Sequence, residues 1–365
     1  MTQRRIRAVY MRGGTSRALF FHARDLPPPG PARDWIFLRA LGSPDPYGRQ
    51  LDGLGGGISS LSKCCVVGPP TRPDADVDYT FAQVDVRAPV VDYAGNCGNC
   101  SAAVGPFAVD EGLVPAREGE TVVRIHNTNT GKLIVAHVPV QGGAAAVEGD
   151  FELAGVPGRG ARIALDFLDP GGAVTGRLLP TGRVRDVLDG AEVSIVDATN
   201  PVVFVRARDL GLVGDERPEA IDADRALAAR LEQLRAAAAR LAGIAPSPAV
   251  PKVALVAPPA PFAALDGTRY EPAAVDVLAR VISMGACHRA VALTAAMCLA
   301  VAARVPGTVV HECARPGAGD LRLGHPSGTL PVAAVVRARA DGPWAERVTV
   351  YRTARRLMEG YVLVP

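Results

Sequence analysis

The chain has 365 residues, of which 48% are hydrophobic and 21% charged, so a mainly disordered protein is excluded and about two domains are expected. The formal net charge is only +3, from 40 basic and 37 acidic residues that are interspersed, which argues against a nucleic-acid partner. Aromatic residues make up 5%, whereas there are 39 glycines and 31 prolines, which indicates many turns and a core of small aliphatic side chains.

The N-terminal segment lacks the apolar stretch of a secretory signal. The longest nearly apolar run, residues 290–303, is shorter than the roughly 20 residues that a membrane span needs. Seven cysteines, an odd number without an export signal, favour free thiols in a reducing compartment. We therefore expect a cytoplasmic protein with no membrane partner, and we leave open whether it forms a homodimer.

In the first half, short runs rich in Val, Ile and aromatic residues alternate with Gly, Pro and Asn, which predicts a series of strands. One helix is expected over residues 101–111, and because it is apolar nearly all round, we expect a sheet to wrap it. The strands are expected at residues 5–11, 18–21, 63–67, 77–86, 121–126 and 133–140.

The second half repeats this pattern. An amphipathic surface helix is expected over residues 222–241 with Asp222 as its N-cap, and an almost wholly apolar, buried helix over residues 287–304. We place the domain boundary between the two halves, giving domains 1–184 and 185–365, and leave open whether the last strand returns to the first domain. The strands of this half are expected at residues 194–205, 252–256, 330–338 and 347–351.

Two cysteines lie before the first buried helix, in the segment Gly-Asn-Cys-Gly-Asn-Cys that ends at Cys100. Gly and Asn around Cys97 allow a tight turn with free backbone N–H groups. A helix N-terminus favours a thiolate and can bind a carboxylate, so we predict that Cys97 is the reactive thiol. The alternatives are two small buried side chains, a redox dithiol or half of a zinc site. Without a second C-x-x-C, a His pair or a thioredoxin-like context, the last two have little support.

A glycine-rich segment, Gly-Leu-Gly-Gly-Gly-Ile-Ser-Ser-Leu-Ser-Lys, ends at Lys63, where a strand is expected to begin. Its glycines allow close backbone approach, and the hydroxyls of Ser59, Ser60 and Ser62 are expected to bind an anion. The pattern differs from the G-x-x-x-x-G-K-[ST] loop of nucleotide-binding proteins. Lys63 is either a solvated residue at a strand end or a partly desolvated acid or base, and the Cys-Cys-Val-Val that follows favours the second interpretation.

A third polar segment, Tyr-Met-Arg-Gly-Gly-Thr-Ser-Arg, joins the first two predicted strands. We expect Arg12 to bind a carboxylate together with the turn formed by Gly14, Thr15 and Ser16, because an arginine can form a bidentate pair with a carboxylate. The alternative interpretation is an ordinary hairpin turn with surface arginines.

Two polar segments of the second half gather glycines and hydrogen-bond donors as at the mouth of a pocket. Ser-Met-Gly-Ala-Cys-His opens the second buried helix, and His-Pro-Ser-Gly precedes a late strand. A lone histidine is more often structural than catalytic, so we assign these residues to binding. They are Ser283, Met284, Gly285, His325, Pro326, Ser327 and Gly328.

Together, these segments resemble the PrpF family, the methylaconitate isomerases and their relatives with a diaminopimelate-epimerase-like fold. Each segment alone is weak evidence, but they occur in the family's order along nearly the whole chain. The matching segments are Met-Arg-Gly-Gly-Thr-Ser at 11–16, Gly-Gly-Gly-Ile-Ser-Ser-Leu-Ser-Lys at 55–63, Gly-Asn-Cys-Gly-Asn at 95–99, Asn-Thr-Asn-Thr-Gly-Lys at 127–132 and His-Pro-Ser-Gly at 325–328.

The resemblance implies an α+β fold of two similar domains, each a curled, mostly antiparallel sheet around a central buried helix, with the active site in the cleft between them. It also implies isomerisation without a cofactor or metal, in which a proton leaves one carbon of a small unsaturated polycarboxylate and returns at another. Cys97 matches the family's catalytic cysteine and Lys63 its catalytic lysine. Which of the two is the base stays open.

The chain departs from the family's pattern at two places. Many relatives have Lys-Gly where this chain has Arg17 and Ala18, which leaves the substrate open. Relatives commonly have Met or another apolar residue at the position of Cys100. Diaminopimelate epimerases use a second cysteine in a Cys-Gly-x-Gly pattern, and Cys287 does not fit that pattern, so an epimerase has less support.

We therefore predict an isomerase that moves a C=C bond in a di- or tricarboxylate of the 2-methylaconitate, 4-oxalomesaconate or methylitaconate type. The backbone N–H groups of Gly98, Asn99 and Cys100 are expected to stabilise the negative charge that develops. Two alternatives stay open: a racemase or epimerase on the same fold, and a non-catalytic protein that binds a polycarboxylate for a partner enzyme.

Overall fold

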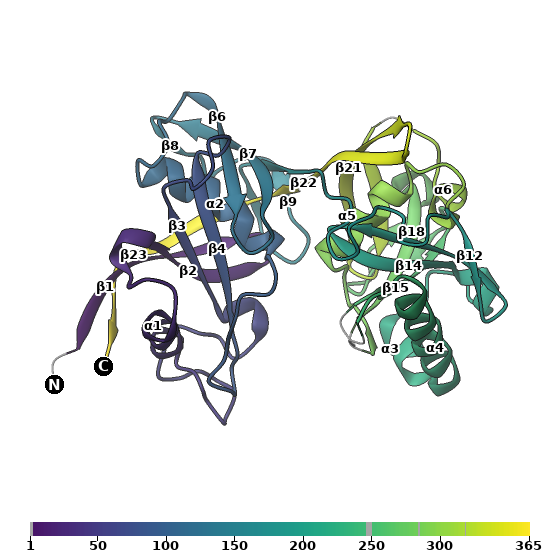
Figure 1. The fold of residues 1–365 in the computed structure, drawn as a ribbon, viewed down its shortest axis with the longest axis horizontal. Helices are drawn as coiled ribbons and strands as arrows, with labels where there is room; N and C mark the ends of the chain where they lie inside the picture. The colour runs from purple at the N-terminus through teal and green to yellow at the C-terminus, as the bar shows by residue number, and fades with distance from the viewer. Residues whose placement is uncertain (1–2, 246–249, 284, 318) are drawn as a thin grey trace. The chain divides into compact units, whose positions relative to one another are not determined.

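The computed structural model describes residues 3–245, 250–283, 285–317 and 319–365. The chain forms two compact units (Figure 1). Unit 1 comprises Met1–Asp166 and Tyr351–Pro365, and unit 2 comprises Phe167–Val350. Within its described residues, no helix is long and apolar enough to cross a membrane.

The sheet of unit 1 is antiparallel except for two parallel pairs, β2–β3 and β4–β6. A short strand, β5 (Val91–Asp92), also pairs with β4. In the order of their hydrogen-bonded neighbours, the strands are β23 (Ala354–Val364), β1 (Arg4–Gly13), β2 (Ser16–His22), β3 (Lys63–Gly68), β4 (Val77–Val84), β6 (Gly119–Asn127), β7 (Lys132–Gln141) and β8 (Ala144–Ala145).

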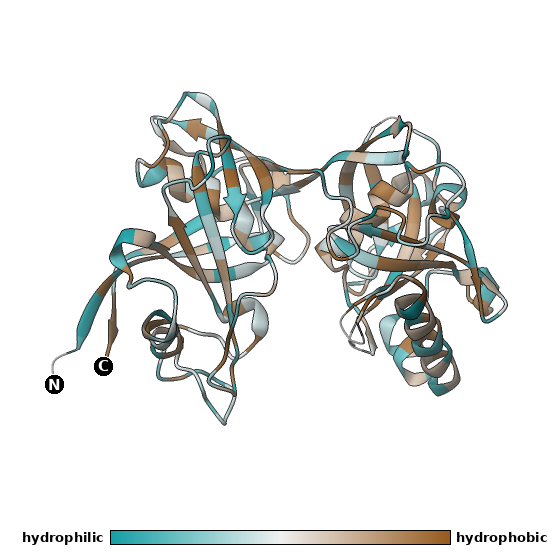
Figure 2. Cartoon of the chain, viewed as in Figure 1, coloured by the Kyte–Doolittle hydropathy of each residue, from teal (hydrophilic) through white to brown (hydrophobic). Residues whose placement is uncertain are grey.

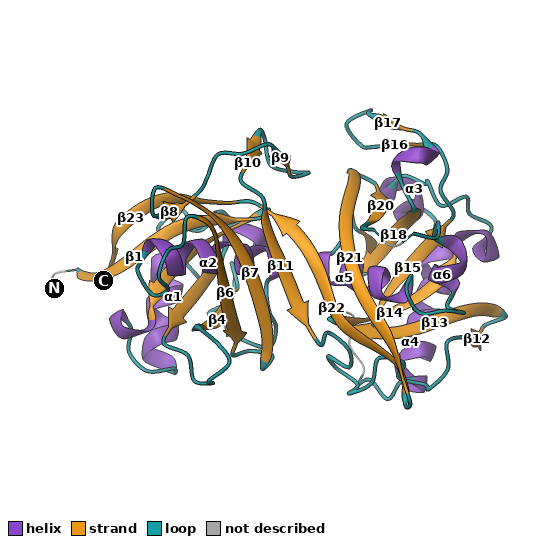
Figure 3. Ribbon diagram, turned by 90° about the horizontal axis from the view of Figure 1, so that it is seen from above, coloured by secondary structure: helices purple, strands orange, loops and turns teal. Residues whose placement is uncertain are grey.

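Helix α2 (Gly98–Asp110) is the central helix of unit 1 and is buried over most of its length, as its uniformly apolar sequence predicts. It contacts strands from β1 round to β8, so the sheet curls around it (Figure 3). The packing is close: a Cβ atom on Gly105 would lie 2.6 Å from Val138 Cγ2 of β7. Helix α1 (Pro31–Leu41) covers the other face of the sheet, where it packs on alternate residues of β1, β2, β3 and β4.

Unit 2 repeats the same succession of antiparallel and parallel pairs, with β14–β15 and β18–β20 parallel. Its strands, in the order of their hydrogen-bonded neighbours, are β12 (Asp186–Leu188), β13 (Ala191–Ala198), β14 (Asn200–Arg206), β15 (Lys252–Ala257), β18 (Val277–Ser283), β20 (Leu321–His325), β21 (Gly328–Arg339) and β22 (Gly342–Arg352), of which the last two residues belong to unit 1.

Helix α5 (Leu293–Ala302) is buried at the centre of unit 2 and contacts β13, β14 and β21. Helix α4 (Arg225–Leu241) lies on the outside and carries both hydrophilic and hydrophobic residues along its length (Figure 2). Its apolar residues pack on β14 and β15. Two short helices complete the unit, α3 (Pro218–Ala223) and α6 (Val309–Cys313).

The remaining elements are short, apart from β11, which spans the point where the chain passes from unit 1 to unit 2. They are β9 (Phe151–Glu152), β10 (Arg159–Gly160), β11 (Ile163–Leu168), β16 (Phe262–Ala263), β17 (Arg269–Tyr270), β19 (Ala286–Cys287) and the 3₁₀ helices Ala23–Asp25, Ser59–Leu61, Ala207–Leu210 and Pro272–Ala274.

Most of the predicted strands and both buried helices are confirmed, with local corrections. The strand predicted over 194–205 is two strands, β13 and β14, because Thr199 adopts φ 65° and turns the chain. The second buried helix begins at Leu293, since Cys287 instead pairs with Ile282 in a short strand. Asp224, not Asp222, caps α4: its carboxylate accepts the Leu227 N–H at 3.0 Å.

The predicted boundary between residues 184 and 185 falls inside unit 2. The chain enters unit 2 earlier, because the segment after β11 is hydrogen-bonded to β13 and its turn. The Gly172 N–H donates to the Asp197 carbonyl at 2.8 Å, and the Thr199 N–H donates to the Pro170 carbonyl at 2.8 Å. At the other end, β23 pairs with β1 along its length, so the C-terminal strand belongs to unit 1.

Candidate active site

Cys97 is the N-cap of helix α2. Its backbone is extended, with φ −109° and ψ 100°, and its Sγ accepts the Cys100 N–H at 3.5 Å. Ser101 holds the same turn, because its Oγ donates to the Cys97 carbonyl at 3.0 Å. The thiol therefore lies where the unpaired N–H groups of the helix converge, as the sequence predicts.

Three thiols lie in a row beneath this turn. The Cys97 and Cys100 side chains are hydrogen-bonded to each other, and Cys100 is also hydrogen-bonded to Cys65 of β3. The Cys65 Sγ lies 3.9 Å from the Tyr79 hydroxyl. All seven cysteines are free thiols in the structure.

The hydrogen bond with Cys100, followed by burial, raises the pKa of Cys97 well above its usual value. The nearby Lys63 ammonium acts in the opposite direction and lowers this pKa, but more weakly. The overall direction is opposite to the lowered pKa expected at a helix N-terminus, and it favours the protonated thiol, which is the form that donates a proton.

Lys63 begins β3 and shares the α2-facing side of the strand with Cys65. The residue is only 7% exposed. Its Nζ donates to the Gln83 side-chain oxygen and lies 5.0 Å from the centre of the Phe81 ring. Gln83 is held in turn, because its Nε2 donates to the Ser62 carbonyl at 2.9 Å. Throughout the described part of the chain, no carboxylate pairs with Lys63, so a buried cation is available to a negatively charged ligand.

The Gly-Gly turn between β1 and β2 lies against the first turn of α2. A Cβ atom on Gly13 would lie 2.5 Å from the Asn99 carbonyl oxygen, and one on Gly14 would lie 2.3 Å from Asn99 Oδ1. Asn99 Nδ2 donates to Thr15 Oγ1 at 3.1 Å, which ties the turn to the helix. The structure therefore brings the predicted Gly14, Thr15 and neighbouring Ser16 together with Gly98, Asn99 and Cys100.

Arg12 is not part of this cluster. Side chains alternate along a strand, so Arg12 lies on the side of β1 opposite to Met11 and Gly13, which face α2. Its Nη1 donates to the Gly14 carbonyl at 3.0 Å and to the Thr353 carbonyl at 2.9 Å. These bonds assign it a structural role, holding the turn to the segment that joins β22 and β23.

The glycine-rich loop also differs from its expected role as an anion site. Ser62 is fully buried, and its hydroxyl donates to the Val84 carbonyl at 2.9 Å and accepts from Gln50 Nε2 at 2.7 Å. The glycines make room for Gln50: a Cβ atom on Gly55 would lie 2.2 Å from its Oε1. Ser62 is thus structural, whereas Ser59 and Ser60 are at least partly accessible in their 3₁₀ turn.

The binding residues predicted in the second half lie in unit 2, as far as the structure describes them. His325 ends β20 and is 3% exposed, and its Nδ1 accepts the Ser327 N–H at 3.2 Å. The Ser327 hydroxyl donates to the Arg289 carbonyl at 2.6 Å. His325, Pro326, Ser327 and Gly328 thus form the tight turn between β20 and β21. Ser283 ends β18 and Gly285 is exposed, whereas Met284 lies outside the described residues.

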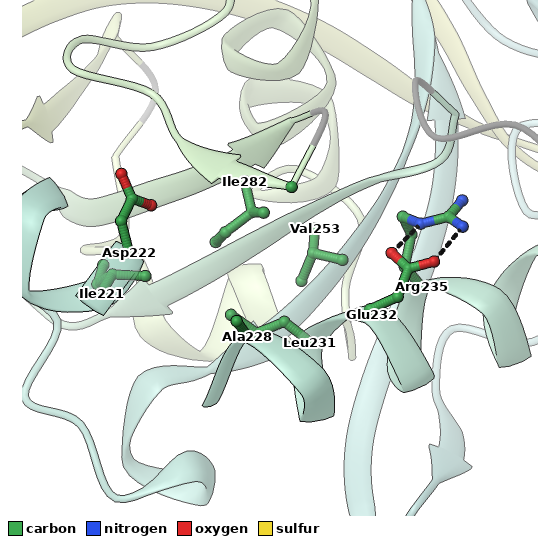
Figure 4. A pocket seen from close by; sticks show the side chains of 9 residues that line it. Ile221, Asp222, Ala228, Leu231, Glu232, Arg235, Val253 and Ile282 are labelled. Atoms are coloured by element: carbon green, nitrogen blue, oxygen red, sulfur yellow. Dashed lines mark hydrogen bonds and ion pairs between the residues drawn. The ribbon is translucent and has the colours of Figure 1, made fainter. Parts of the chain in front are cut away.

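Figure 4 shows a small pocket of unit 2 between α4 and the sheet. Its volume is about 40 Å³, close to the space of one water molecule, and apolar side chains such as Leu231, Val253 and Ile282 line it. The Glu232–Arg235 ion pair lies at one side. A polycarboxylate does not fit there. Among the described residues, no group of three His, Cys, Asp or Glu side chains could hold a metal ion.

Three residues around the site were missed by reasoning from the sequence. Gln83 lies directly opposite Lys63 in the β3–β4 register, and that register could have pointed to it. Asn129 donates to the Tyr93 carbonyl at 2.9 Å and so supports the loop before Cys97, within a segment that the family resemblance had already marked. Arg352 at the end of β22 had no sequence signal, because only the fold brings it to α2.

Comparison with known proteins identifies the family. The PrpF protein family model matches residues 3–365. The chain is 46% identical to 3-methylitaconate isomerase of Eubacterium barkeri, over 99% of this chain and 98% of that protein. It is 44% identical to 2-methyl-aconitate isomerase of Cupriavidus necator, over 100% and 98%, and 40% identical to 4-oxalomesaconate tautomerase of Pseudomonas putida, over 100% and 97%.

Solved structures agree. A crystal structure of methylitaconate-delta-isomerase superimposes with a TM-score of 0.92 at 45% identity, covering 100% of this chain and 96% of the other. A probable proline racemase from Agrobacterium radiobacter shares the fold, with a TM-score of 0.53 at 14% identity, covering 99% and 93%. The predicted fold of two epimerase-like halves is thereby confirmed. The chain belongs to the PrpF family, and it is an isomerase.

Proposed function

We propose that this protein moves a C=C bond in a small unsaturated di- or tricarboxylate, of the kind named for its 3-methylitaconate, 2-methylaconitate and 4-oxalomesaconate relatives. The observation that carries the proposal is that a buried lysine, Lys63 at the start of β3, and a helix-capping thiol, Cys97 at the start of α2, belong to two elements that pack together. An acid and a base of this kind are what a proton shift between two carbons requires.

The reaction begins when a base removes a proton from a carbon next to the double bond. The electron pair spreads over three carbons and an attached carboxylate, and a second group returns a proton at the far carbon. The raised pKa of Cys97 favours the thiol as the group that returns the proton, and Lys63, after its ammonium has released a proton to water, as the amine that removes one from the substrate. Afterwards the lysine ammonium and the thiolate exchange protons with water, which restores the starting state.

Negative charge develops on the substrate in the intermediate. The backbone N–H groups at the start of α2, from Gly98 and Asn99, belong to the unpaired donors of the helix N-terminus and would stabilise that charge. The hydroxyl of Thr15 lies beside them and adds a further donor. We include the expected cytoplasmic location in this proposal, since the sequence has seven cysteines, an odd number that favours free thiols.

The test is proton NMR of the purified protein with each of the three acids in D₂O. A double-bond isomerase gives a product with a shifted double bond and deuterium at the newly protonated carbon. A racemase or epimerase introduces deuterium without moving the double bond. A binding protein does neither. The second or third result with all three acids would contradict the proposed function.

A further inference from the structure

Arg352 is a buried cation beside the proposed catalytic thiol. The residue is 5% exposed. Its Nε donates to Asn99 Oδ1 at 3.2 Å and its Nη1 donates to the Tyr351 carbonyl at 2.8 Å. No carboxylate of the described chain forms an ion pair with it, and Nη2 has no protein partner there.

Among the other buried arginines that the structure describes, Arg206 is neutralised by carboxylates, whereas Arg33 and Arg280 donate only to backbone carbonyls. Arg356 of the following strand pairs with Glu111 and Glu359, and Arg206 of unit 2 pairs with Glu192 and Glu312. Burial without a carboxylate partner therefore does not by itself mark a ligand site in this protein, whereas a buried cation beside the N-terminus of α2 can contact an anion bound there. Arg352 is in that position, and its free donor is a terminal N–H group of the kind that binds carboxylates.

The Arg352 guanidinium and the Cys97 thiol lie in the same part of unit 1. Burial lowers the pKa of Arg352 to about 10, which leaves it a cation at neutral pH, and negative charge on Cys97 opposes this shift. The geometry agrees, because Arg352 Nε donates to Asn99, which follows Cys97 by two residues in the first turn of α2. A carboxylate bound to Arg352 would place the adjoining carbons next to the thiol.

The surrounding residues hold Arg352 in place. A Cβ atom on Gly14 would lie 3.1 Å from Arg352 Cδ, so the glycine of the Gly-Gly turn leaves the space that this side chain fills. Asn99 accepts from Arg352 and donates to Thr15, so a chain of hydrogen bonds joins all three. Arg12 binds the carbonyl of Thr353, the next residue, and thereby supports the same segment from the other side.

We propose that Arg352, rather than Arg12, binds a carboxylate of the substrate and positions it against Cys97. This inference rests on the proposed function only in taking the ligand to be a carboxylate. It gives the motif Met-Arg-Gly-Gly-Thr-Ser a different task from the one expected: its glycines accommodate Asn99 and Arg352, and its arginine supports the segment that carries the binding residue.

The first arm of the test is kinetic and uses Arg352→Gln and Arg352→Lys, with Arg12→Lys as the matched control. We expect Arg352→Gln to lower kcat/KM by about 10- to 100-fold, mostly through KM, as for a lost hydrogen bond to a charged group. Arg352→Lys should recover part of this loss. Arg12→Lys should stay within a few-fold of wild type. Unchanged kcat/KM in a folded Arg352→Gln variant would overturn the inference.

The second arm does not depend on turnover. Alkylation of Cys97 by iodoacetamide is followed by peptide mapping with and without succinate, an unreactive dicarboxylate. Succinate should slow labelling in the wild type and in Arg12→Lys, but require at least tenfold higher concentration in Arg352→Gln. Equal protection of all three proteins, or protection of none, would overturn the inference. Protection without turnover of any candidate acid would instead contradict the proposed function alone.

Circular dichroism and thermal unfolding check that each variant is folded. If Arg352→Gln does not fold, the comparison rests on Arg352→Lys, which keeps the charge but not the planar, forked geometry. In that case Arg352→Lys should raise KM for the substrate and the succinate concentration needed for protection by the same factor. A purely structural role for Arg352 would lower the unfolding temperature without this parallel shift.

Discussion

The two units have the same succession of strand pairs around a buried helix, yet they differ at the N-terminus of that helix. In unit 1, Lys63 begins the third strand and Cys97 caps the helix; in unit 2, Lys252 begins the corresponding strand, but α5 starts after Ala292, which provides no side-chain cap. The fold therefore supplies the same platform twice, and the thiol that would carry the chemistry is present at only one of them.

The two units also differ in the turn between two antiparallel strands, at Gly14 between β1 and β2 in unit 1 and at Thr199 between β13 and β14 in unit 2. Gly14 and Thr199 both have positive φ angles, of 50° and 65°. At Gly14 a side chain would collide with Asn99 and Arg352, whereas Thr199 carries a side chain whose hydroxyl donates to the Thr294 carbonyl at 2.9 Å. In unit 1 the glycine leaves space that the Arg352 side chain occupies. In unit 2 the Thr199 side chain occupies the space beside the turn.

The largest effect is expected at Lys63 and Cys97. Lys63→Ala should lower kcat by about 10²–10⁴-fold, because it removes a general acid–base group, and Cys97→Ser should do the same. The double variant should cost little more than the worse single change, since the two groups act as a unit. Steady-state kinetics of the folded variants measure this. Lys252→Ala is the matched control in unit 2, and a loss as large as that of Lys63→Ala would break the comparison between the units.

The next largest effect is expected at Gly14. Gly14→Ala adds a Cβ atom 2.3 Å from Asn99 Oδ1 at a positive φ angle, so we expect about 2–4 kcal/mol of destabilisation together with a higher KM. Gly176 has φ 76° and no heavy atom within 4 Å of an added Cβ. Gly176→Ala should therefore cost only about 1 kcal/mol of strain and leave KM unchanged. Urea unfolding measures the stability of both variants, and steady-state kinetics measure their KM values. Equal losses of stability in Gly14→Ala and Gly176→Ala would show that the collision with Asn99 is unimportant.

Glu111 anchors the C-terminal end of α2. Its carboxylate is 3% exposed and pairs with Arg356, with His22 at 2.8 Å and with Arg7 at 2.9 Å. Burial raises the pKa of Glu111, but the hydrogen bonds from Arg356 and His22 outweigh it and lower this pKa overall. At pH 7, Glu111→Gln should lower the free energy of unfolding by about 1–3 kcal/mol.

The pH dependence of this effect follows from the sign of the shift. The pKa of Glu111 is lower in the folded than in the unfolded protein, so its stabilisation is present above the unfolded value of about 4.3 and is lost as the pH falls through the folded value. The difference between wild type and Glu111→Gln should therefore shrink below about pH 4. Glu312→Gln in unit 2, where the carboxylate is 38% exposed, should cost less than about 1 kcal/mol at pH 7. A difference for Glu111 that persists in acid would contradict the account.

The smallest effect concerns thiol reactivity. Cys100→Ala removes the side-chain hydrogen bond that is the main cause of the raised pKa of Cys97, so this pKa should fall and alkylation of Cys97 at pH 8 should speed up by about 2- to 10-fold. Lys63→Ala removes a contribution in the opposite direction and should slow alkylation. Cys298→Ala, in the buried helix of unit 2, is the control and should leave the rate unchanged. Slower alkylation in Cys100→Ala would contradict the assignment.

Periodicity and local motifs predicted the architecture well. Uniformly apolar runs predicted both central helices, and the segment before Cys97 placed the thiol at a helix N-terminus. Helix α1 was missed although its signals were present, with Pro31 at its first position and Gly42 in a left-handed conformation after its end. These are local properties of the chain, and residue types close in sequence determine them.

The site was predicted less completely, because long-range contacts decide what each side chain does. Ser62 reads as an anion-binding hydroxyl until the fold supplies Gln50 and the Val84 carbonyl as partners. The raised pKa of Cys97 depends partly on burial within the folded unit, which no local pattern in the sequence reports. Arg352 lies 253 residues from Asn99 along the chain, and no local pattern reports their contact.

The most direct test of the central claim, that Lys63 removes the proton and Cys97 returns it, is proton NMR of the Cys97→Ser variant in D₂O with an acid that the wild type converts. We predict that this variant exchanges the substrate's allylic proton for deuterium without moving the double bond, because removal proceeds while return at the far carbon fails. Lys63→Ala should show neither process. Exchange by Lys63→Ala but not by Cys97→Ser would contradict the account.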